Sequence, residues 1–439
     1  MKKTVSFYTL GCKVNQYETN AMEQQFIKNN YEIVENTQKA DIYVINTCTV
    51  TNMAERKSRQ MLRRVKEINP FAVLVVCGCY AQVAKNELEQ IPEIDIILGI
   101  NEKNEIVQIV ENYMEKMAEQ DKRSQEAEID DVSKQKEFLD FGDVTYTEKN
   151  RAVVKVQDGC NQFCTYCIIP YARGRIRSRT MESIKAELER LSASGFKEIV
   201  LTGINLSCYD DNGKKLIDVI EMADNVNGIE RIRLGSLDPE VVTEDFVERL
   251  GKVKKICPHF HFSLQSGCDK TLKAMNRHYT SDEYYEKCQL IRKYIDNPAF
   301  TTDVIVGFPG ETEEDYISSR EFVKKVKFAE LHVFKYSKRD GTVAAKMPNQ
   351  IDEKIKTLRS EDLIKTGEEL TKEFRQAKIG QDTTVLFEEK ILLDNKEYWV
   401  GHTVDYIKIA VPEKENLEGQ IRKVNVKDFL TNEIMLATM

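Results

Sequence analysis

The chain has 439 residues, of which 41% are hydrophobic and 31% are charged, and its formal net charge is −8. This length allows two to four domains, and no apolar run approaches the ~20 residues that a membrane-spanning helix needs. The N-terminus, Met1-Lys2-Lys3, leads into a strand-like run without a small-residue cleavage site, so we expect a cytoplasmic protein without a signal peptide. The acidic balance means that any binding of nucleic acid must rest on a local surface.

Cysteine is frequent for a chain of this kind. There are eleven cysteines, and a reducing compartment disfavours disulfides. The cysteine content therefore predicts metal ligation.

The first part of the chain, 1–117, alternates short apolar strands with helices. Such alternation is typical of βαβ units around a parallel sheet. The expected strands are 4–10, 41–46, 73–76 and 94–98, and the expected helices are 16–28, 52–68, 81–89 and 103–117.

The segment 118–142 is dense in charge and shows a poor apolar stripe. We interpret it as a charged linker, partly helical. An exposed helix of the first domain explains the same composition equally well.

A second series of strands and helices occupies 143–375. Six strands with crossover helices predict a partial β/α barrel, whose working residues lie at the C-terminal ends of the strands. The expected strands are 152–157, 198–202, 231–234, 259–264, 302–306 and 331–336; the expected helices are 181–194, 216–224, 239–250, 281–294, 313–326 and, highly charged, 351–377.

The last part, 376–439, changes to short alternating strands at 383–387, 397–400, 407–411 and 421–426. This pattern predicts a small β-barrel of OB-like size. The whole chain is therefore expected to be an α/β protein with an N-terminal parallel α/β domain, a central partial barrel and a C-terminal β-barrel.

Three cysteines lie close together in a loop directly after the first barrel strand: Cys160, Cys164 and Cys167. Thiolates hold iron–sulfur clusters, and a closed four-iron cluster uses four of them. Three protein ligands leave one iron open to a small molecule.

Three further cysteines, Cys12, Cys48 and Cys79, each follow a predicted parallel strand of the first domain. Ligands of open α/β sheets bind at that edge, so these thiols could converge on a second cluster with an open iron; chance placement explains them equally well. Cys77 lies within a strand, so we interpret it as core. The same interpretation applies to Cys208, Cys257, Cys268 and Cys288.

The spacing Cys160-x3-Cys164-x2-Cys167, with Tyr166 before the last cysteine, resembles the signature of radical S-adenosylmethionine enzymes. Together with the Cys167-Ile168-Ile169-Pro170-Tyr171-Ala172-Arg173-Gly174 extension and the contexts of Cys12, Cys48 and Cys79, the chain resembles a methylthiotransferase over nearly its whole length. The resemblance implies an N-terminal cluster domain, a radical core and a C-terminal TRAM barrel.

The resemblance also implies cofactors: two 4Fe-4S clusters, one held by each set of three cysteines, and S-adenosylmethionine. One cluster would generate a 5′-deoxyadenosyl radical and the other would present a methylated sulfide to the substrate carbon. An electron donor such as flavodoxin or ferredoxin is implied as a partner. No side chain is assigned as a catalytic acid or base. The residues expected at the S-adenosylmethionine pocket are Tyr166, Thr202, Gly203, Asn205, Ser236 and Gln265, and ordinary βα turns explain several of them as well.

Arginine recurs at every second position in Arg173, Arg175, Arg177 and Arg179. If the segment is extended, one face carries four guanidiniums, whose forks match phosphate geometry. We therefore interpret this arginine ladder as an RNA-binding surface beside the active-site loop, with a solvated, ion-paired surface as the alternative.

Resemblance also separates the substrates. Lys13-Val14-Asn15 after Cys12 resembles the branch that modifies N6-threonylcarbamoyladenosine in the tRNA anticodon stem-loop. The alternatives are isopentenyladenosine in tRNA, a side chain of a ribosomal protein and, in a non-catalytic class, an iron–sulfur electron carrier. Asn205 departs mildly from that branch, where histidine is commoner.

The C-terminal part departs from expectation for an RNA-binding barrel. It carries eight Lys or Arg against eleven Asp or Glu, a net charge of −3. Trp399 and Tyr406 could stack on a base, although barrel core is the favoured interpretation of the tryptophan.

Overall fold

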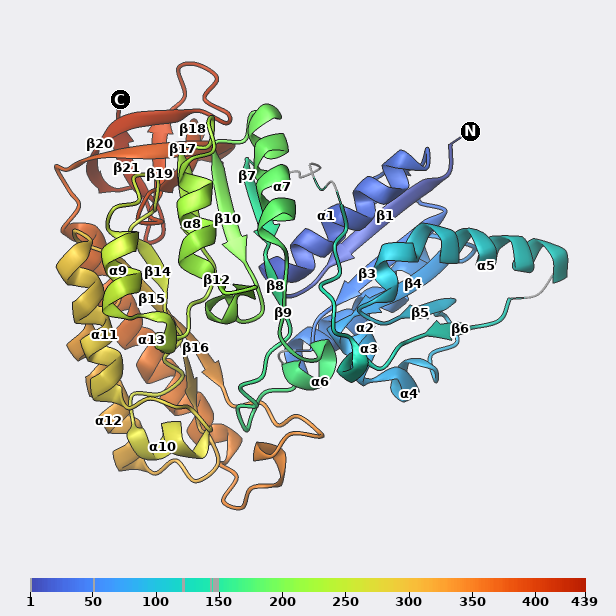
Figure 1. Ribbon diagram of the computed structural model, residues 1–439, viewed down its shortest axis with the longest axis horizontal. Coiled ribbons are helices and arrows are strands. Elements are labelled where there is room, and N and C mark those ends of the chain that lie inside the picture. The colour runs from blue at the N-terminus through green and yellow to red at the C-terminus, as the bar shows by residue number, and fades with distance from the viewer. Residues whose placement is uncertain (1, 50–51, 121–122, 143, 145–149) are drawn as a thin grey trace.

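The computed structural model describes residues 2–49, 52–120, 123–142, 144 and 150–439, with the backbone alone over 52–57. Three parts pack against one another (Figure 1). The N-terminal α/β domain lies on one side of a curved sheet, and the C-terminal barrel covers one end of that sheet. No helix among the described residues is both long and apolar enough to cross a membrane.

The N-terminal domain is built on a 6-stranded parallel sheet in the order β2-β1-β3-β4-β5-β6. Its strands are β1 (Thr4–Thr9), β2 (Glu32–Ile33), β3 (Ile42–Thr47), β4 (Val73–Gly78), β5 (Ile96–Leu98) and β6 (Glu126–Glu128). Its helices are α1 (Lys13–Lys28), α2 (Asn52–Ile68), α3 (Cys79–Val83), α4 (Lys85–Leu88) and α5 (Ile106–Gln120), and the 3-10 turn η1 spans Glu102–Glu105.

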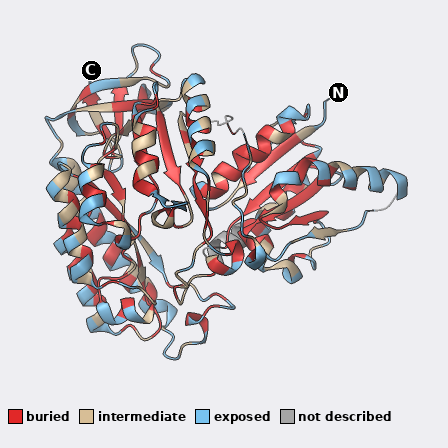
Figure 2. Cartoon of the chain, viewed as in Figure 1, coloured by how far each residue is buried: buried red, intermediate tan, exposed pale blue. Residues whose placement is uncertain are grey.

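The central strands of this sheet are buried on both faces (Figure 2). Side chains alternate between the faces. Val44 and Val75 therefore join one apolar core, while Ile45 and Val76 join the other. This explains the continuous apolar runs of β3 and β4, which are typical of parallel strands covered by helices.

The segment expected to be a partly helical linker has a different structure. Helix α5 continues to Gln120, and β6 then adds an edge strand to the sheet beside β5. After β6, the 3-10 turn η2 (Val132–Lys134) packs Val132 against Ala172 of the central part. The linker prediction is therefore wrong for β6, because charge density did not reveal that backbone pairing supplies its stability.

The central part confirms the expected partial barrel. Strands β13-β10-β7 and β14-β15-β16 form two parallel sheets, and isolated parallel bridges, Ile232 to Ile256 and Leu237 to Phe262, connect them. The strands are β7 (Arg151–Lys155), β10 (Glu198–Thr202), β13 (Arg231–Leu234), β14 (His259–His261), β15 (Ala299–Val306) and β16 (Glu330–Lys335).

Helices cover the outer face of this curved sheet and enclose one large apolar core with it. They are α7 (Met181–Ala193), α8 (Leu216–Asp224), α9 (Glu244–Leu250), α10 (Asp269–Ala274), α11 (Ser281–Tyr294), α12 (Glu313–Val326) and α13 (Glu353–Gln376). The short elements of the connections are α6 (Ile169–Arg173), β8 (Gln157–Asp158), β9 (Arg177–Ser178), β11 (Asp210–Asp211), β12 (Lys214–Lys215), η3 (Leu206–Cys208), η4 (Pro239–Val241) and η5 (Ala344–Lys346).

The C-terminal strands close into a barrel in the order β17-β18-β19-β21-β20. They are β17 (Asp382–Leu393), β18 (Lys396–Thr403), β19 (Lys408–Pro412), β20 (Ile421–Phe429) and β21 (Met435–Thr438). Trp399 is only 3% exposed and belongs to the barrel core, which confirms the favoured interpretation. Strand β21 was not expected from the sequence.

The C-terminal barrel is fixed to the central part by buried arginines of β13. Arg231 and Arg233 both pair with the buried Glu198. Their guanidinium groups also donate to barrel backbone carbonyls, including those of His402 and Thr403, and Arg231 donates to the Thr384 hydroxyl. Tyr406 lies at the same junction, where its ring stacks on His259 and His402 and receives the Arg233 guanidinium at 4.7 Å. Tyr406 therefore packs between domains, contrary to the suggestion that it stacks on an RNA base.

We predict that Tyr406→Ala lowers the free energy of unfolding of the C-terminal barrel by about 3 kcal/mol, because truncating a packed aromatic ring leaves a cavity. Urea unfolding followed by fluorescence measures this directly, since the only tryptophan of the chain lies inside the barrel. Leu392→Ala is the control, because Leu392 is 68% exposed on β17 and should be nearly neutral. Equal stability of the two variants would contradict the interdomain role of Tyr406.

Candidate active site

The cysteines of the N-terminal domain meet at one edge of its sheet. Cys12, Cys48 and Cys79 follow β1, β3 and β4, which are neighbours in the sheet. The backbone before Cys12 passes so close to Cys48 that a Cβ on Gly11, whose φ is +106°, would lie 2.7 Å from the Cys48 Sγ. A glycine is needed there because a side chain has neither the space nor the backbone conformation.

Cys77 has a different environment from these three. It is fully buried within β4 and belongs to the apolar core on one face of the sheet. Burial raises the pKa of Cys77 to about 11, but burial also raises the pKa of Cys79, so the apolar surroundings and not the pKa set Cys77 apart. The structure therefore places Cys77 where the core interpretation puts it.

The three-cysteine loop of the central part follows β8 and is held against the segment that contains β9. The Cys160 amide donates to the Gly174 carbonyl at 3.1 Å. Gly159 has a φ of +70°, and a Cβ there would lie 1.9 Å from the Arg175 carbonyl oxygen. The loop thus depends on a glycine directly before its first cysteine.

Of the three cysteines of this loop, Cys164 is buried, and Cys160 and Cys167 are partly buried. Burial, followed by the neighbouring Cys164, raises the pKa of Cys167 to about 12. Burial also raises the pKa of Cys160, although a hydrogen bond from the Gln162 backbone N–H opposes this. Metal coordination reverses this preference, since a ligating thiol is deprotonated outright. Donors already face the sulfurs: Arg277 Nη1 lies 3.5 Å from the Cys164 Sγ, and Asn205 Nδ2 lies 3.9 Å from the Cys160 Sγ. The donor set therefore fits a thiolate-bound iron–sulfur cluster.

The expected S-adenosylmethionine residues lie around the mouth of the partial barrel, at or just beyond strand ends. Asn205 adjoins Cys160, and its backbone N–H donates to the side chain of the buried Gln157 at 2.8 Å. Gln265 adopts a φ of 66°, and its backbone N–H donates to the Asp303 backbone carbonyl. Of the others, Thr202 is buried, Ser236 is exposed, Tyr166 packs partly buried in an apolar cluster, and Gly203 packs against Gln157. Their role in binding S-adenosylmethionine stays a prediction.

Sequence reasoning missed Arg277, which follows α10 and forms an ion pair of 2.6 Å with Asp238. It also missed a polar group formed by His261, Asp303 and His332, whose ligand atoms lie within 4.8 Å of one another. These three residues come from β14, β15 and β16. Their neighbours Phe260 and Val304 belong to the core under the helices, so the alternation of the strands places the group on the inner face of the barrel. That alternation was the available signal.

The arginine ladder is not a surface. Arg173, Arg177 and Arg179 are 0%, 4% and 1% exposed, and only Arg175 is exposed to solvent. The prediction of a four-arginine RNA-binding face is therefore wrong for these three. Arg179 pairs with the buried Glu187 and donates to the Tyr17 hydroxyl of α1. The physical reason is that α1 and α7 cover this segment, which a local pattern does not reveal.

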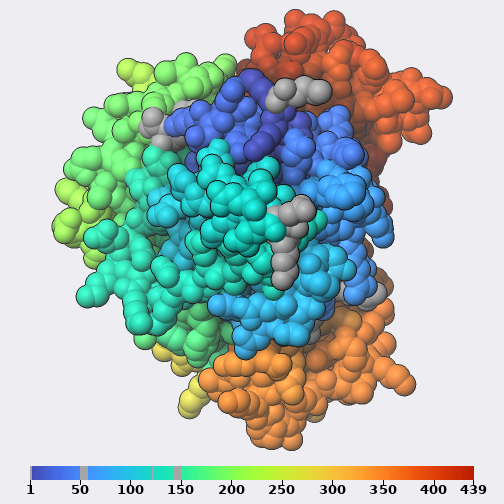
Figure 3. Space-filling model, turned by 90° about the vertical axis from the view of Figure 1, so that its right-hand side faces the viewer, coloured from blue at the N-terminus to red at the C-terminus, as the bar shows by residue number. Residues whose placement is uncertain are grey.

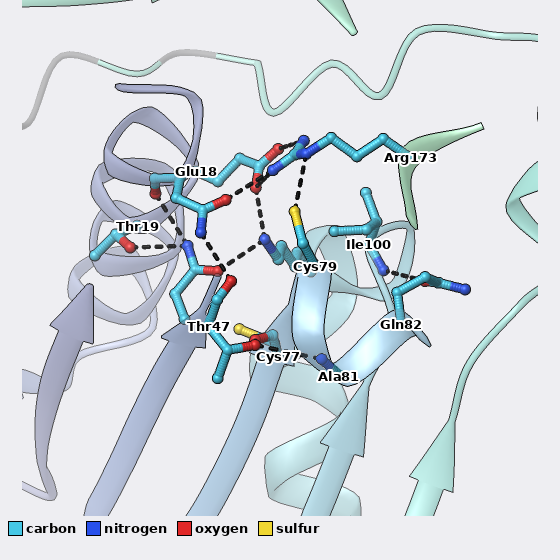
Figure 4. A network of polar contacts seen from close by, with 12 residues as sticks. Glu18, Thr19, Thr47, Cys77, Cys79, Ala81, Gln82, Ile100 and Arg173 are labelled. Carbon is cyan, nitrogen blue, oxygen red and sulfur yellow. Dashed lines mark hydrogen bonds and ion pairs between the residues drawn. The ribbon is translucent and has the colours of Figure 1, made fainter. Parts of the chain in front are cut away.

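The buried arginines belong to ion pairs that join the N-terminal domain to the central part (Figure 4). Glu18 of α1 accepts from Lys103 at 2.5 Å, from Lys155 at 2.8 Å and from Arg173 at 2.8 Å. Asp158 accepts from Lys155 at 2.6 Å and from Arg173 at 3.2 Å. Burial alone would raise the pKa of Glu18, but the cations, with Arg173 foremost, hold that pKa well below its ordinary value. The pKa of Asp158 is lowered to about 2, since Lys155 and Arg173 outweigh its burial.

Comparison with known proteins agrees with this architecture. Two family models match: the Radical SAM superfamily over residues 154–323, and a family described as Uncharacterized protein family UPF0004 over residues 4–99. A radical S-adenosylmethionine methyltransferase, TsrM from Kitasatospora setae, solved with cobalamin and a 4Fe-4S cluster, shares the fold. Its TM-score is 0.56 at 15% identity, covering 79% of this chain and 77% of that chain. The fold and the three-cysteine loop thus define a radical S-adenosylmethionine enzyme.

Closer relatives narrow this class. The chain is 40% identical to the threonylcarbamoyladenosine tRNA methylthiotransferase MtaB of Bacillus subtilis, over 96% of this chain and 93% of that protein. It is 40% identical to the MtaB of Aquifex aeolicus, over 89% and 95%. The tRNA-2-methylthio-N(6)-dimethylallyladenosine synthase of Thermodesulfovibrio yellowstonii is 33% identical, over 95% and 99%. The chain belongs to the family of radical S-adenosylmethionine tRNA methylthiotransferases, enzymes that use S-adenosylmethionine and iron–sulfur chemistry.

We predict that Gly159→Ala removes about half of the bound iron, because the added Cβ cannot be accommodated beside the Arg175 carbonyl and the loop of Cys160 must move. Iron content per chain after anaerobic reconstitution is the measurement. Gly213→Ala is a matched control: Gly213 also has a positive φ, +89°, but nothing lies within 4 Å of an added Cβ. Full iron content in Gly159→Ala would refute the dependence of the loop on this glycine.

Proposed function

We propose that the enzyme adds a methylthio group to C2 of N6-threonylcarbamoyladenosine beside the tRNA anticodon, using two 4Fe-4S clusters. Cys160, Cys164 and Cys167 would hold one cluster, and Cys12, Cys48 and Cys79 the other. The choice of nucleoside is supported by the relatives at 40% identity, whose names carry threonylcarbamoyladenosine. Lys13-Val14-Asn15 after Cys12 supports the same choice.

One cavity supports the proposal that both clusters act in the same reaction. Its volume is about 690 Å³, and its wall includes Thr49, Tyr80 and Ile168. Each of these residues directly follows a proposed ligand: Cys48, Cys79 and Cys167 respectively. Residues next to ligands of both sets therefore line one cavity, and this supports a substrate carbon placed where one centre can activate it and the other can deliver sulfur.

The remaining wall of this cavity suits RNA. It includes the half-exposed Tyr171, the exposed Lys338 and the buried Arg339, together with the acidic Glu87 and Asp340. Aromatic rings stack on unpaired bases, and cationic side chains contact phosphates. These side chains support a nucleotide of a single-stranded loop as the occupant.

The chain supplies orientation and exclusion of water, whereas S-adenosylmethionine and the clusters, when bound, supply the radical and sulfur chemistry. Arg277 and Asn205 orient donors toward the sulfurs of Cys164 and Cys160. The His261, Asp303 and His332 group on the inner barrel face offers hydrogen-bond donors and acceptors for a purine edge. We propose further that the enzyme works in the cytoplasm and receives electrons from a small carrier such as flavodoxin or ferredoxin.

The second candidate function is methylthiolation of isopentenyladenosine in tRNA, supported by relatives at 32–36% identity that are named dimethylallyladenosine synthases. Such a substrate presents an apolar group where threonylcarbamoyladenosine presents a carboxylate and a hydroxyl. A side chain of a ribosomal protein, as the substrate of the remaining branch, has no support among these relatives.

We predict that cells lacking the protein lose 2-methylthio-N6-threonylcarbamoyladenosine and retain its unmethylthiolated precursor, as measured by mass spectrometry of tRNA nucleosides. The triple variant with Cys12, Cys48 and Cys79 changed to Ala should not restore the modification. It should keep about half of the roughly eight irons of the complete protein and still cleave S-adenosylmethionine.

Three results would each exclude part of this proposal. An unchanged level of the modified nucleoside would exclude the substrate. A loss of methylthiolated isopentenyladenosine would favour the second candidate function. Loss of all iron, or of none, in the triple variant would exclude two independent clusters.

We predict that Arg175→Ala weakens binding of the tRNA anticodon stem-loop and reduces the slope of log affinity against log salt by about 1, because one phosphate contact is removed. Arg175 is exposed and lies with its guanidinium 4.6 Å from the centre of the Phe163 ring, beside the three-cysteine loop. Lys252→Ala is the control, because Lys252 is an exposed cation just after α9 that pairs with Glu248. An unchanged salt slope for Arg175→Ala would return the whole arginine ladder to a structural role.

A further inference from the structure

The ion pairs between the two cysteine sets contain more cations than anions. Lys103, Lys155, Arg173 and Arg177 are four buried cations. Glu18 and Asp158 are the buried carboxylates with which they pair. Among these six side chains, the formal charge is therefore +2. Burying net charge is costly unless an ion of opposite sign lies nearby, so the group is built to face an anion.

One cation of this group contacts a proposed cluster ligand directly. Arg173 Nε donates to the Cys79 Sγ at 3.2 Å, and Figure 4 shows its guanidinium between that sulfur and Glu18. A cysteine sulfur that ligates iron is a thiolate, which is the anion that the excess positive charge requires. Hydrogen bonds to cluster sulfurs are among the factors that set the reduction potential of a cluster.

The other N–H groups of Arg173 hold its guanidinium in place. Nη1 donates to Glu18 at 2.8 Å and to Asp158 at 3.2 Å, and Nη2 donates to Asn15 at 2.7 Å and to Glu18 at 3.1 Å. The fork is planar and fully buried, so little freedom remains to the Nε–H that faces Cys79.

The position of Arg173 in the chain relates both cysteine sets to each other. It ends α6, the helix that begins two residues after Cys167, and its partner Asp158 lies two residues before Cys160. Its partners Asn15 and Glu18 lie on α1, whose N-cap is Cys12. One guanidinium thus contacts Asp158, just before the three-cysteine loop, and Cys79, at the edge of the N-terminal sheet.

We infer that Arg173 is a positioning residue: it fixes Cys79 relative to the three-cysteine loop, and with its cationic neighbours it stabilises the negative charge of the N-terminal cluster. This inference rests on the proposed function in one respect, the binding of that cluster by Cys12, Cys48 and Cys79. Two consequences follow, namely slower loss of iron from this cluster and a higher reduction potential than an exposed cluster with three thiolates would have.

The experiment isolates the N-terminal cluster in the full-length chain. Cys160, Cys164 and Cys167 are changed to Ala, and the protein is reconstituted anaerobically with iron and sulfide. Arg173→Gln and Arg173→Lys are then compared with this parent. Two quantities are measured: the rate of iron release to a chelator, and the midpoint potential from a redox titration followed by electron paramagnetic resonance. Neither depends on catalytic activity.

Arg179 provides the matched control. It is another buried arginine of the same ladder, it also contacts α1, through Tyr17, and it pairs with a buried carboxylate, Glu187. Among the described residues, the hydrogen bonds and ion pairs of the Arg179 side chain are made with Asp140, Ser183, Tyr17 and Glu187, and none of these is a cysteine. Arg179→Gln therefore reports how far a general loosening of the domain junction affects the cluster.

Arg173→Gln should release iron about ten- to a hundredfold faster than the parent, the usual cost of removing a partner that orients a metal ligand, and its midpoint potential should be lower. Arg173→Lys keeps the charge but not the fork, so it should fold. Its rate of iron release and its midpoint potential should lie between those of Arg173→Gln and those of the parent. Arg179→Gln should match the parent in both quantities. Parent-like values for Arg173→Gln and Arg173→Lys, or equal changes in the Arg179 variant, would overturn the inference.

A different result is expected if Cys12, Cys48 and Cys79 hold no cluster, the part of the proposed function on which this inference rests. The parent would then bind no iron, and this would be seen before any arginine is changed. Should Arg173→Gln not fold, the lysine variant decides: parent-like iron release and potential in Arg173→Lys would overturn the role of the fork.

Discussion

The guanidinium of Arg173 is the point on which the arrangement of this enzyme depends. It lies without access to water between Glu18 of the N-terminal domain and Asp158 of the central part, so its ion pair with Glu18 exists only while the N-terminal domain is docked on the central part. Breaking a buried ion pair by removing one partner is far costlier than never having formed it. The position of the domain is therefore specified by charge as much as by apolar contact.

Apolar packing completes the same junction. Tyr17 and Ala21 of α1 pack with Val144 and Val153, and Figure 3 shows the N-terminal domain lying against the remainder of the molecule. At the opposite end of the central sheet, Glu198 and the arginines of β13 repeat the strategy toward the C-terminal barrel, with backbone carbonyls as the acceptors. Buried arginines thus join the three domains. They pair with carboxylates at both junctions and also donate to backbone carbonyls at the junction with the C-terminal barrel.

Much of this fold follows from local pattern. The helices at Asn52–Ile68, Ser281–Tyr294 and Glu313–Val326 have the expected bounds, because their periodicity is encoded within a few residues. The last two also begin with local capping boxes. The strand ends that carry Cys12, Cys48 and Cys79 were also predictable, since apolar runs of parallel strands stop where the chain leaves the sheet. For the same reason the sequence placed the three-cysteine loop on the working rim.

The failures share a physical cause. The arginine ladder has the right spacing for a charged face, but spacing does not tell what covers the face, and α1 lies far away in sequence. Strand β6 was missed because its stability comes from pairing with β5, while its own composition is that of a linker. The His261, Asp303 and His332 group arises only when three strands are brought side by side. Each of these features depends on contacts between segments that are distant in sequence, so the sequence of one segment alone does not reveal it.

Strand β6 also restricts how a substrate can enter. The chain leaves the N-terminal domain as an edge strand of its sheet and reaches the central part through Val132, which packs against Ala172 near Cys79. Swinging the domain aside would strain the contact of Val132 with Ala172 as well as breaking the contacts of Arg173 with Glu18 and Cys79. With the domain held in this way, the cavity lined by Thr49, Tyr80 and Ile168 keeps its place, and its volume of about 690 Å³ lies in the range of small-molecule sites. A tRNA nucleotide that enters such a cavity would have to leave its stack, and the energy of unstacking that base would then contribute to substrate selection.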